Sequence, residues 1–151
     1  MPAFNPSIDA LDARILALLA AEGRMALSEV ARQVGLSSPS VTDRVRRLES
    51  DGVIRGYAAE IDLVRLGYPL MALVRVRPVP GRLRDVEALL KQTAECIECD
   101  KVTGEDCFVA RVVLRSVQHL DQVLEGFADI AETNSSLIKS TPVALRLPPL
   151  R

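Results

Sequence analysis

The segment 36–49 constrains the fold of this chain more than any other stretch, because it predicts a helix with a well-defined start and a single apolar side. Ser37 is suited to cap the first turn, and Pro39 falls inside that turn, where its missing N–H removes no helical hydrogen bond. The apolar side chains recur at helical spacing and form one stripe, Val41, Val45 and Leu48. The segment is therefore predicted to rest on a core along this stripe and to expose its opposite side.

The exposed side of this helix has the composition of a helix that enters the major groove of DNA. Short hydroxyl side chains at its tip would let the backbone approach base edges, and arginines one turn later would reach phosphates or guanine. An ordinary amphipathic surface helix is the alternative when the segment is considered alone. The candidate DNA-binding residues, with one arginine beyond the helix, are Ser37, Ser38, Pro39, Ser40, Thr42, Asp43, Arg46, Arg47 and Arg55.

The segments that precede this helix favour the DNA-binding interpretation. Asp9 is suited to begin a first helix, in which Leu11 and Ile15 start an apolar stripe. A second, shorter helix is expected over about 27–34, and Gly35 suits the left-handed position that closes it. Two helices joined by such a turn form a helix-turn-helix, a far more specific pattern than either helix alone.

Residues 53–61 follow another glycine stop and are interpreted as two strands around a turn at Gly56, a wing beside the three helices. Arg55 would then lie near a phosphate, although an arginine that is merely solvated at a hairpin is an alternative. Residues 24–59 carry six arginines against four acidic residues, a weakly basic patch that is consistent with DNA binding but does not establish it. The sequence thus predicts a winged helix-turn-helix domain over residues 1–61.

The second half of the chain alternates between strands and helices. A linker with one helical turn is expected over 62–68, followed by a separate domain over 69–151. The predicted order is strand, helix, strand, strand, helix, strand, over 70–76, 82–93, 96–102, 108–114, about 117–127 and 136–147. This order is that of the ferredoxin-like βαββαβ fold, which makes the chain α+β. Because its helices cover one face of the sheet, apolar residues on both faces predict that a second subunit covers the other.

The composition indicates where the protein is located and which kinds of chemistry it can carry out. The net charge is −1, and neither a basic leader with an apolar segment nor a long apolar run is present, so we expect a cytoplasmic protein without a membrane partner. Three cysteines, an odd number, indicate reduced thiols. With one histidine and no set of nucleophile and base, the chain is predicted to have no catalytic residues and not to be an enzyme.

A dense, ordered series of short motifs runs along the N-terminal half, namely Ile8–Asp12, Ile15-Leu16, Glu22–Arg24, Val30-Ala31, Val34–Ser37, Arg44–Glu49 and Gly52–Ile54. These motifs closely resemble the Lrp/AsnC family, the leucine-responsive and asparagine-synthase regulators of bacteria and archaea. The resemblance implies a transcriptional regulator that binds double-stranded DNA and assembles as homodimers, with a tetramer of dimers (an octamer) as the expected assembly. The two-fold symmetry of a dimer predicts a roughly palindromic operator.

The resemblance extends to the second half, where the loop 102–108 joins the two middle strands. In such relatives this loop and a hydroxyl-rich segment help to bind an amino-acid effector between dimers. Gly104 would let the backbone approach a carboxylate, and a nearby acid could pair with an ammonium; a plain hairpin turn with solvated acids is the alternative. Many members have an aromatic residue followed by aspartate where this chain has Asp106-Cys107, which leaves open which carboxylate meets the ligand. The candidate effector-binding residues are Thr103, Gly104, Glu105, Asp106, Thr133, Ser135 and Ser136.

The cysteines leave two other interpretations open. Cys96 and Cys99, with Cys107 on the neighbouring strand, would suit a thiol- or metal-sensing regulator on the same scaffold. A small ligand-binding protein or enzyme is a further alternative. Positions three apart on a strand point to opposite faces, which opposes chelation unless the strand begins after Cys96. Buried thiols are therefore expected, and no metal site or cofactor is predicted apart from the amino-acid effector.

Overall fold

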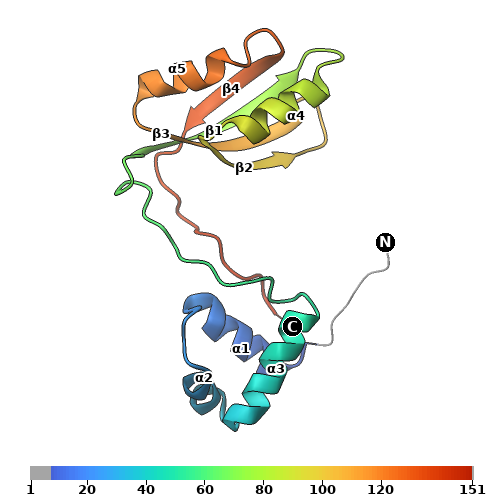
Figure 1. The fold of residues 1–151 in the computed structure, drawn as a ribbon, viewed down its shortest axis with the longest axis vertical. Helices are drawn as coiled ribbons and strands as arrows, with labels where there is room; N and C mark the ends of the chain where they lie inside the picture. Colours follow the sequence, from blue (N-terminus) through green and yellow to red (C-terminus); the bar gives the residue numbers. More distant parts are fainter. Residues whose placement is uncertain (1–7, 151) are drawn as a thin grey trace. The chain divides into compact units, whose positions relative to one another are not determined.

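The computed structural model describes residues 8–150, which divide into two compact units (Figure 1). The first unit holds residues 8–60 together with 143–150, and the second holds residues 61–142. The segment 62–68 groups with the second unit and forms one hydrogen-bonded turn, in which the Tyr68 N–H donates to the Leu63 carbonyl at 2.9 Å. Among the described residues, no helix is both long enough and apolar enough to cross a membrane.

The first unit is built from three helices, α1 (Ala10–Ala21), α2 (Leu27–Val34) and α3 (Ser38–Ser50). Ser37 caps α3 and Pro39 stands in its first turn, as predicted. Gly35 takes the left-handed conformation with φ 76°, and its N–H donates to the Ala31 carbonyl at 3.0 Å. The three helices share one core, formed by Ile15, Leu16, Leu19, Val30, Ala31, Val34, Val41, Val45 and Leu48. The predicted helix-turn-helix is confirmed.

The prediction of two wing strands is wrong, since residues 53–61, all of them described, form no strand. The N–H groups of Val53 and Ile54 both donate to the Leu48 carbonyl, at 2.9 and 3.0 Å, and the two side chains pack against the helical core. These hydrogen bonds end α3, and they occupy N–H groups that a β-strand would need for pairing. A lone two-stranded hairpin is marginal in water, and beyond Gly56 the segment has no third strand to support one.

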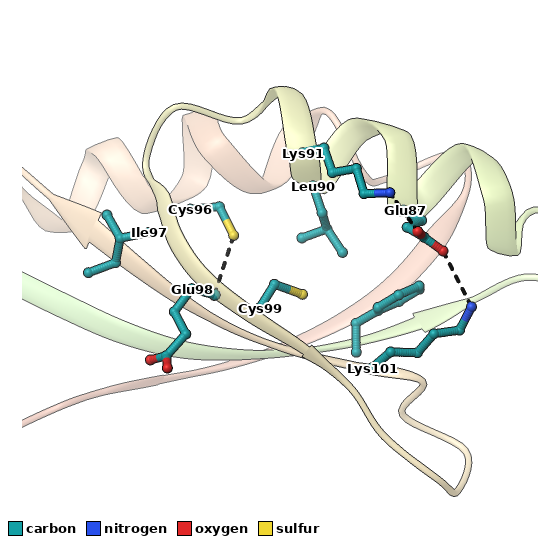
Figure 2. Close-up of a pocket in the computed structure, with 9 residues that line it drawn as sticks. Glu87, Leu90, Lys91, Cys96, Ile97, Glu98, Cys99 and Lys101 are labelled. Carbon is teal, nitrogen blue, oxygen red and sulfur yellow. Dashed lines mark hydrogen bonds and ion pairs between the residues drawn. The ribbon is translucent and has the colours of Figure 1, made fainter. Parts of the chain in front are cut away.

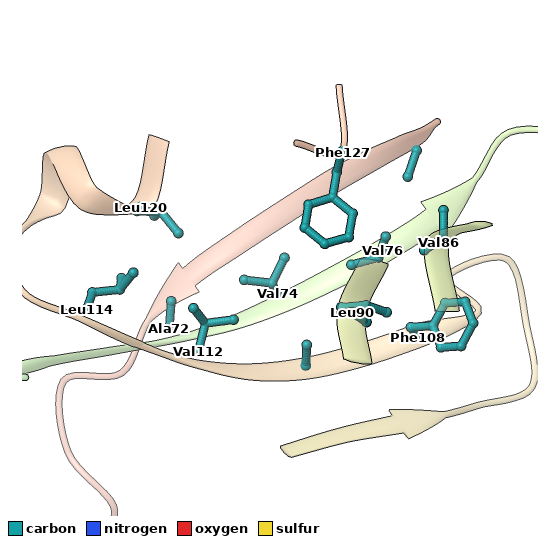
Figure 3. Packing of buried hydrophobic residues seen from close by; sticks show 12 residues of the cluster. Ala72, Val74, Val76, Val86, Leu90, Phe108, Val112, Leu114, Leu120 and Phe127 are labelled. Atoms are coloured by element: carbon teal, nitrogen blue, oxygen red, sulfur yellow. The ribbon is translucent and has the colours of Figure 1, made fainter. Parts of the chain in front are cut away.

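The second unit is a four-stranded antiparallel sheet with two helices, in the predicted order βαββαβ (Figure 1). Its strands lie side by side as β2-β3-β1-β4. In chain order the elements are β1 (Leu70–Pro78), α4 (Leu83–Gln92), β2 (Cys96–Lys101), β3 (Phe108–Leu114), α5 (Val117–Glu125) and β4 (Ala131–Leu137). The helices cover one face, where the core lies between sheet and helices and includes Val74, Val76, Val86, Leu90, Phe108, Leu114, Leu120 and Phe127 (Figure 3).

The last strand begins and ends earlier than its predicted range of 136–147. Strand β4 pairs with β1 over a register that runs from Ala131 opposite Pro78 to Leu137 opposite Ala72. Five polar residues, from Glu132 to Ser136, fall within it, because β4 is an edge strand and does not need an apolar side chain at every inward position. Residues 138–147 of the predicted range lie outside the sheet.

The second face of the sheet carries no helix of its own unit (Figure 1). At one end it presents half-buried apolar side chains, including those of Met71 and Leu73. At the other end Arg75 and Arg77 are exposed beside the β2–β3 loop. We call this surface the open face; it is apolar at one end and charged at the other.

A β-bulge in β2 corrects one expectation about the cysteines. In the ladder with β3, Cys96 pairs with Val112 and Cys99 pairs with Ala110, while the register shifts between Cys96 and Glu98. Val112 and Ala110 both belong to the buried, helix-covered face. Because the bulge inserts one extra residue, the two cysteines share that face instead of pointing to opposite faces, as their spacing of three predicted.

Candidate DNA interface and effector site

The tip of α3 is a network of short hydroxyl groups. Ser37 Oγ accepts a hydrogen bond from the Ser40 N–H at 3.3 Å and lies 2.8 Å from Ser40 Oγ. Thr42 Oγ1 donates to the Ser38 carbonyl at 2.9 Å. Ser38 and Pro39 are exposed, as are Asp43, Arg46 and Arg47 further along, whereas Thr42 is half-buried. The structure therefore gathers all the predicted α3 residues on the side away from the core.

A buried carboxylate ties α3 to α1 through two arginines. Asp12 is fully buried, and its Oδ1 lies 2.9 Å from Arg44 Nη1 while its Oδ2 contacts Arg47 Nη2 at 2.5 Å. Arg44 also lies 2.6 Å from Asp9 Oδ2. The Asp12 N–H, and then Arg44, hold the pKa of the Asp9 carboxyl below its ordinary value. Sequence reasoning missed this cluster; the available signal was an aspartate on the apolar stripe of α1.

Arg47 thus has a structural contact that the sequence did not predict, whereas Arg46 is free to reach a partner. Arg46 is exposed and forms no ion pair with any residue that the structure describes. It borders a surface depression of about 380 Å³ with Thr42 and Arg24. Tyr57, which follows the exposed Arg55 by two residues, lines the same depression and donates from its hydroxyl to Glu49 Oε1 at 2.9 Å.

On the open face of the second unit, Arg77 gathers the acids of the predicted effector loop. Its Nη2 lies 2.9 Å from Glu105 Oε2 and 3.4 Å from Asp106 Oδ1, and its Nη1 lies 3.9 Å from Glu132 Oε2. Beside it, Arg75 Nη2 donates to Asn134 Oδ1 at 2.9 Å. The groups line a depression of about 280 Å³, formed by Arg75, Arg77, Asp106, Glu132, Thr133 and Asn134.

Of the predicted effector residues, Asp106 and Thr133 line this depression, and Glu105 reaches it through Arg77. Gly104 has a positive φ of 109° in the exposed loop, next to the exposed Thr103. Ser135 lies opposite Val74 of the covered face, whereas Ser136 lies opposite Leu73 of the open face. The β1–β4 register therefore places the two serines on different faces of the sheet.

The arginines of β1 are the residues that sequence reasoning missed at this site. Arg75 and Arg77 alternate with buried valines, so they point to the open face. The sequence carried this signal, since two cations at alternate positions in an otherwise apolar strand need either solvent or an acidic partner. The pairing with the β2–β3 loop depends on the β1–β3 register and is not readable from the local sequence.

Both units match known protein families. Residues 8–55 match the family described as winged helix-turn-helix DNA-binding, and residues 71–147 match the Lrp/AsnC ligand binding domain. A DNA-binding helix-turn-helix and a ligand-binding domain in one chain define a class of transcriptional regulators.

Similar proteins give the particular family. The chain is 38% identical to the transcriptional regulator LrpA of Mycobacterium tuberculosis over 140 residues, which are 91% of this chain and 93% of the relative. It resembles the structure of LrpC of Bacillus subtilis with a TM-score of 0.84 and 26% identity, covering 91% and 98% of the two chains. It also resembles a feast or famine regulatory protein of M. tuberculosis, complexed with L-methionine, with a TM-score of 0.84 and 36% identity over 94% and 99%. The chain belongs to the Lrp/AsnC family of DNA-binding transcriptional regulators and is not an enzyme.

Proposed function

We propose that this regulator binds its operator with the exposed side of α3 and that an amino acid bound to its second unit changes that binding. The observation that supports the DNA part best is the α2–Gly35–α3 arrangement. It fixes α3 on the core through its apolar stripe and leaves the polar side exposed. A helix held in this way can enter a major groove with its N-terminal residues against base edges.

The proposed contacts divide by reach and charge. Short side chains at the tip allow close approach and meet base edges, while guanidinium groups meet phosphates. Ser37 and Pro39 would keep the backbone close, and the base contacts would come from Ser38, Ser40, Thr42 and Asp43. Arg46 and Arg55 would contact phosphates. A guanidinium has five N–H donors, so Arg47 would contribute a further phosphate contact from the donors that Asp12 does not occupy.

The Arg46→Ala variant is expected to bind all DNA sequences more weakly, by similar factors. It should also reduce the slope of log affinity against log salt concentration by about one unit, because one fewer phosphate is neutralised on binding. Fluorescence anisotropy of labelled operator and unrelated duplexes at several salt concentrations measures both quantities.

Arg84→Ala is the matched control for this experiment. Arg84 is an exposed arginine on α4 in the other unit, so its loss removes the same charge away from the proposed interface. Affinity and salt slope should then stay close to the wild-type values. Wild-type behaviour of Arg46→Ala as well would show that α3 does not meet the phosphate backbone through this residue.

The effector is proposed to be an amino acid bound at the charged end of the open face. A free amino acid carries a carboxylate and an ammonium, and the depression there offers both complements: guanidinium groups from Arg75 and Arg77, and a carboxylate from Asp106. The complex of a relative with L-methionine makes that amino acid the first to test. Thermal-shift screening against the twenty amino acids identifies the ligand, since one present at 100 times its Kd adds about 2.7 kcal/mol of stability.

The assembly is proposed to be a homodimer that forms an octamer, with the open face contributing to subunit contacts. The half-buried Met71 and Leu73 at its apolar end support this proposal, since such a surface gains by being covered. Two recognition helices related by a two-fold axis would then read half-sites about 10 base pairs, or a multiple of that, apart.

The Leu73→Asp variant is expected to lower the molar mass of the protein, because it places a charge in the apolar part of the proposed interface. Light scattering after size exclusion measures this change. Gln118→Asp is the control, since it adds the same charge at an exposed position of α5 on the covered side of the sheet. An unchanged mass for Leu73→Asp would exclude this part of the open face from the subunit contact.

A further inference from the structure

The two cysteines of β2 form a pair on the helix-covered side of the sheet edge. The bulge sets Cys96 and Cys99 opposite Val112 and Ala110, which are two positions apart on β3. Two positions along a strand span about 7 Å between Cα atoms, which is at the upper limit of about 6.8 Å for a disulfide. A direct S–S bond is therefore disfavoured, whereas a single atom bonded to both sulfurs would span a wider gap.

A cavity of about 290 Å³ lies beside the pair, between β2 and α4 (Figure 2). Leu90 and Phe108 are buried and form an apolar part of its wall. The cavity therefore has room and apolar surface for a small organic group next to the two thiols.

The charges around the cavity limit what can occupy it. The charged residues that line the cavity balance, since Lys91 and Lys101 both contact Glu87, with Nζ–O distances of 2.7 and 3.3 Å, and Glu98 is a second acid. Partial burial raises the pKa of Cys96, and partial burial together with the nearby Asp100 and Glu87 carboxylates raises that of Cys99 to about 11, so both thiols are protonated at neutral pH. A dication held by two neutral thiols would add two positive charges to this balanced lining, whereas a neutral occupant would leave the balance unchanged.

The number of possible metal ligands near the two cysteines also argues against a metal ion. In the described part of the chain, no three histidine, cysteine or acidic side chains are grouped so that they could hold a metal ion. A structural zinc ion takes four such ligands. The pair therefore suits an electrophilic centre that is satisfied by two sulfurs.

We propose that Cys96 and Cys99 form a dithiol site for a trivalent organoarsenical, with its organic group in the cavity between β2 and α4. In the reaction, R–As=O combines with two S–H groups to give R–As(S–Cys)2 and one water molecule. Two As–S bonds form, the arsenic–oxygen bond is lost, and the two thiol protons leave in the water, so arsenic stays trivalent and no oxidant is required. The product is neutral, as the charges of the cavity favour. This site is separate from the proposed amino-acid site on the open face.

The test uses the full-length, freshly reduced protein and phenylarsine oxide as the probe. We expect one adduct in the intact mass spectrum, equal to the phenylarsenic group less two hydrogens, and retained through gel filtration. Alkylation by iodoacetamide followed by peptide mapping should then show Cys96 and Cys99 protected and Cys107 modified. This mapping is done on the wild type and does not depend on any variant folding. No retained adduct, or protection of Cys107 instead, would overturn the proposal.

Single-cysteine variants test whether both sulfurs are needed. C96S and C99S should each bind the probe on the order of 100-fold more weakly, because the second bond is intramolecular in the wild type. C107S should retain the adduct, since the Cys107 thiol contacts the Glu105 carbonyl at 3.7 Å and does not line the cavity. Wild-type retention by C96S or C99S would mean that one sulfur suffices and would refute the paired site.

Discussion

The Asp12→Ala variant is expected to lose the fold of its N-terminal unit far more readily than the wild type. Asp12 is fully buried, and both of its carboxylate oxygens pair with arginines of α3. Removing it leaves Arg44 and Arg47 without their shared partner and opens a gap between α1 and α3. Breaking a buried pair typically costs about 3–5 kcal/mol; the two arginines are partly exposed, so we expect a value near the lower end.

A loss of this size is a large fraction of the stability of a small domain, which is typically about 5–15 kcal/mol. Peptide-resolved hydrogen exchange measures it, because it reports α1–α3 separately from the sheet. Protection in the three helices should fall about 100-fold or more, while protection in β1 and β3 should be unchanged. DNA affinity should fall with it, since the recognition helix is held by this contact.

Asp9→Ala is the control, because Asp9 pairs with Arg44 at the surface and its side chain is half-exposed. Its effect should be clearly smaller. Arg47→Ala alone should also be milder than Asp12→Ala, since Arg44 would still neutralise Asp12. Wild-type protection in Asp12→Ala would show that the cluster contributes nothing to the packing of α1 on α3.

The helices of the first unit could be predicted from the sequence because their signals are local. Ser37 and Gly35 mark a helix start and a helix end by their own conformational preferences. The apolar stripe of α3 depends only on the helical period. The same holds for β1 and β3, which are rich in apolar residues and are interrupted only by arginines.

The features that sequence reasoning missed depend on contacts between distant residues. The bulge that brings Cys96 and Cys99 to one face arises from how β2 pairs with β3. The wing strands were expected around a turn at Gly56, but the N–H groups of Val53 and Ile54 instead bond to the last turn of α3. The hydrophobic pattern of a segment indicates whether it prefers the strand conformation. Whether a strand forms also depends on whether the chain supplies a neighbouring strand to pair with it.

The effector site could be predicted only in part, because the loop acids form a local pattern whereas their partner is distant in the sequence. The loop acids were found because Gly104-Glu105-Asp106 is a short local pattern and resembles a family motif. Their partner Arg77 lies on β1, 29 positions before Asp106, and only the register of the sheet brings the two together. The candidate site is therefore formed by residues of both the loop and the open face.

The Asp106→Ala variant is expected nearly to abolish binding of the amino acid that the thermal-shift screen identifies. In the proposed site Asp106 pairs with the ligand ammonium, and removing one partner of a desolvated charge pair typically costs about 2–5 kcal/mol, or at least about 30-fold in Kd. Isothermal titration calorimetry measures the loss. DNA affinity without ligand should stay at the wild-type value, because the change lies in the other unit.

Two further variants separate the roles of the charges around Asp106. Glu105 is far more exposed than Asp106, with 82% against 38% of its side chain accessible, so Glu105→Ala should weaken binding less. Arg77→Ala should weaken binding by removing the proposed partner of the ligand carboxylate, and it also frees both loop acids from their cation. If Asp106→Ala and Glu105→Ala both bind as the wild type does, the ammonium is held elsewhere. The loop acids would then serve only to hold Arg77 in place on the open face.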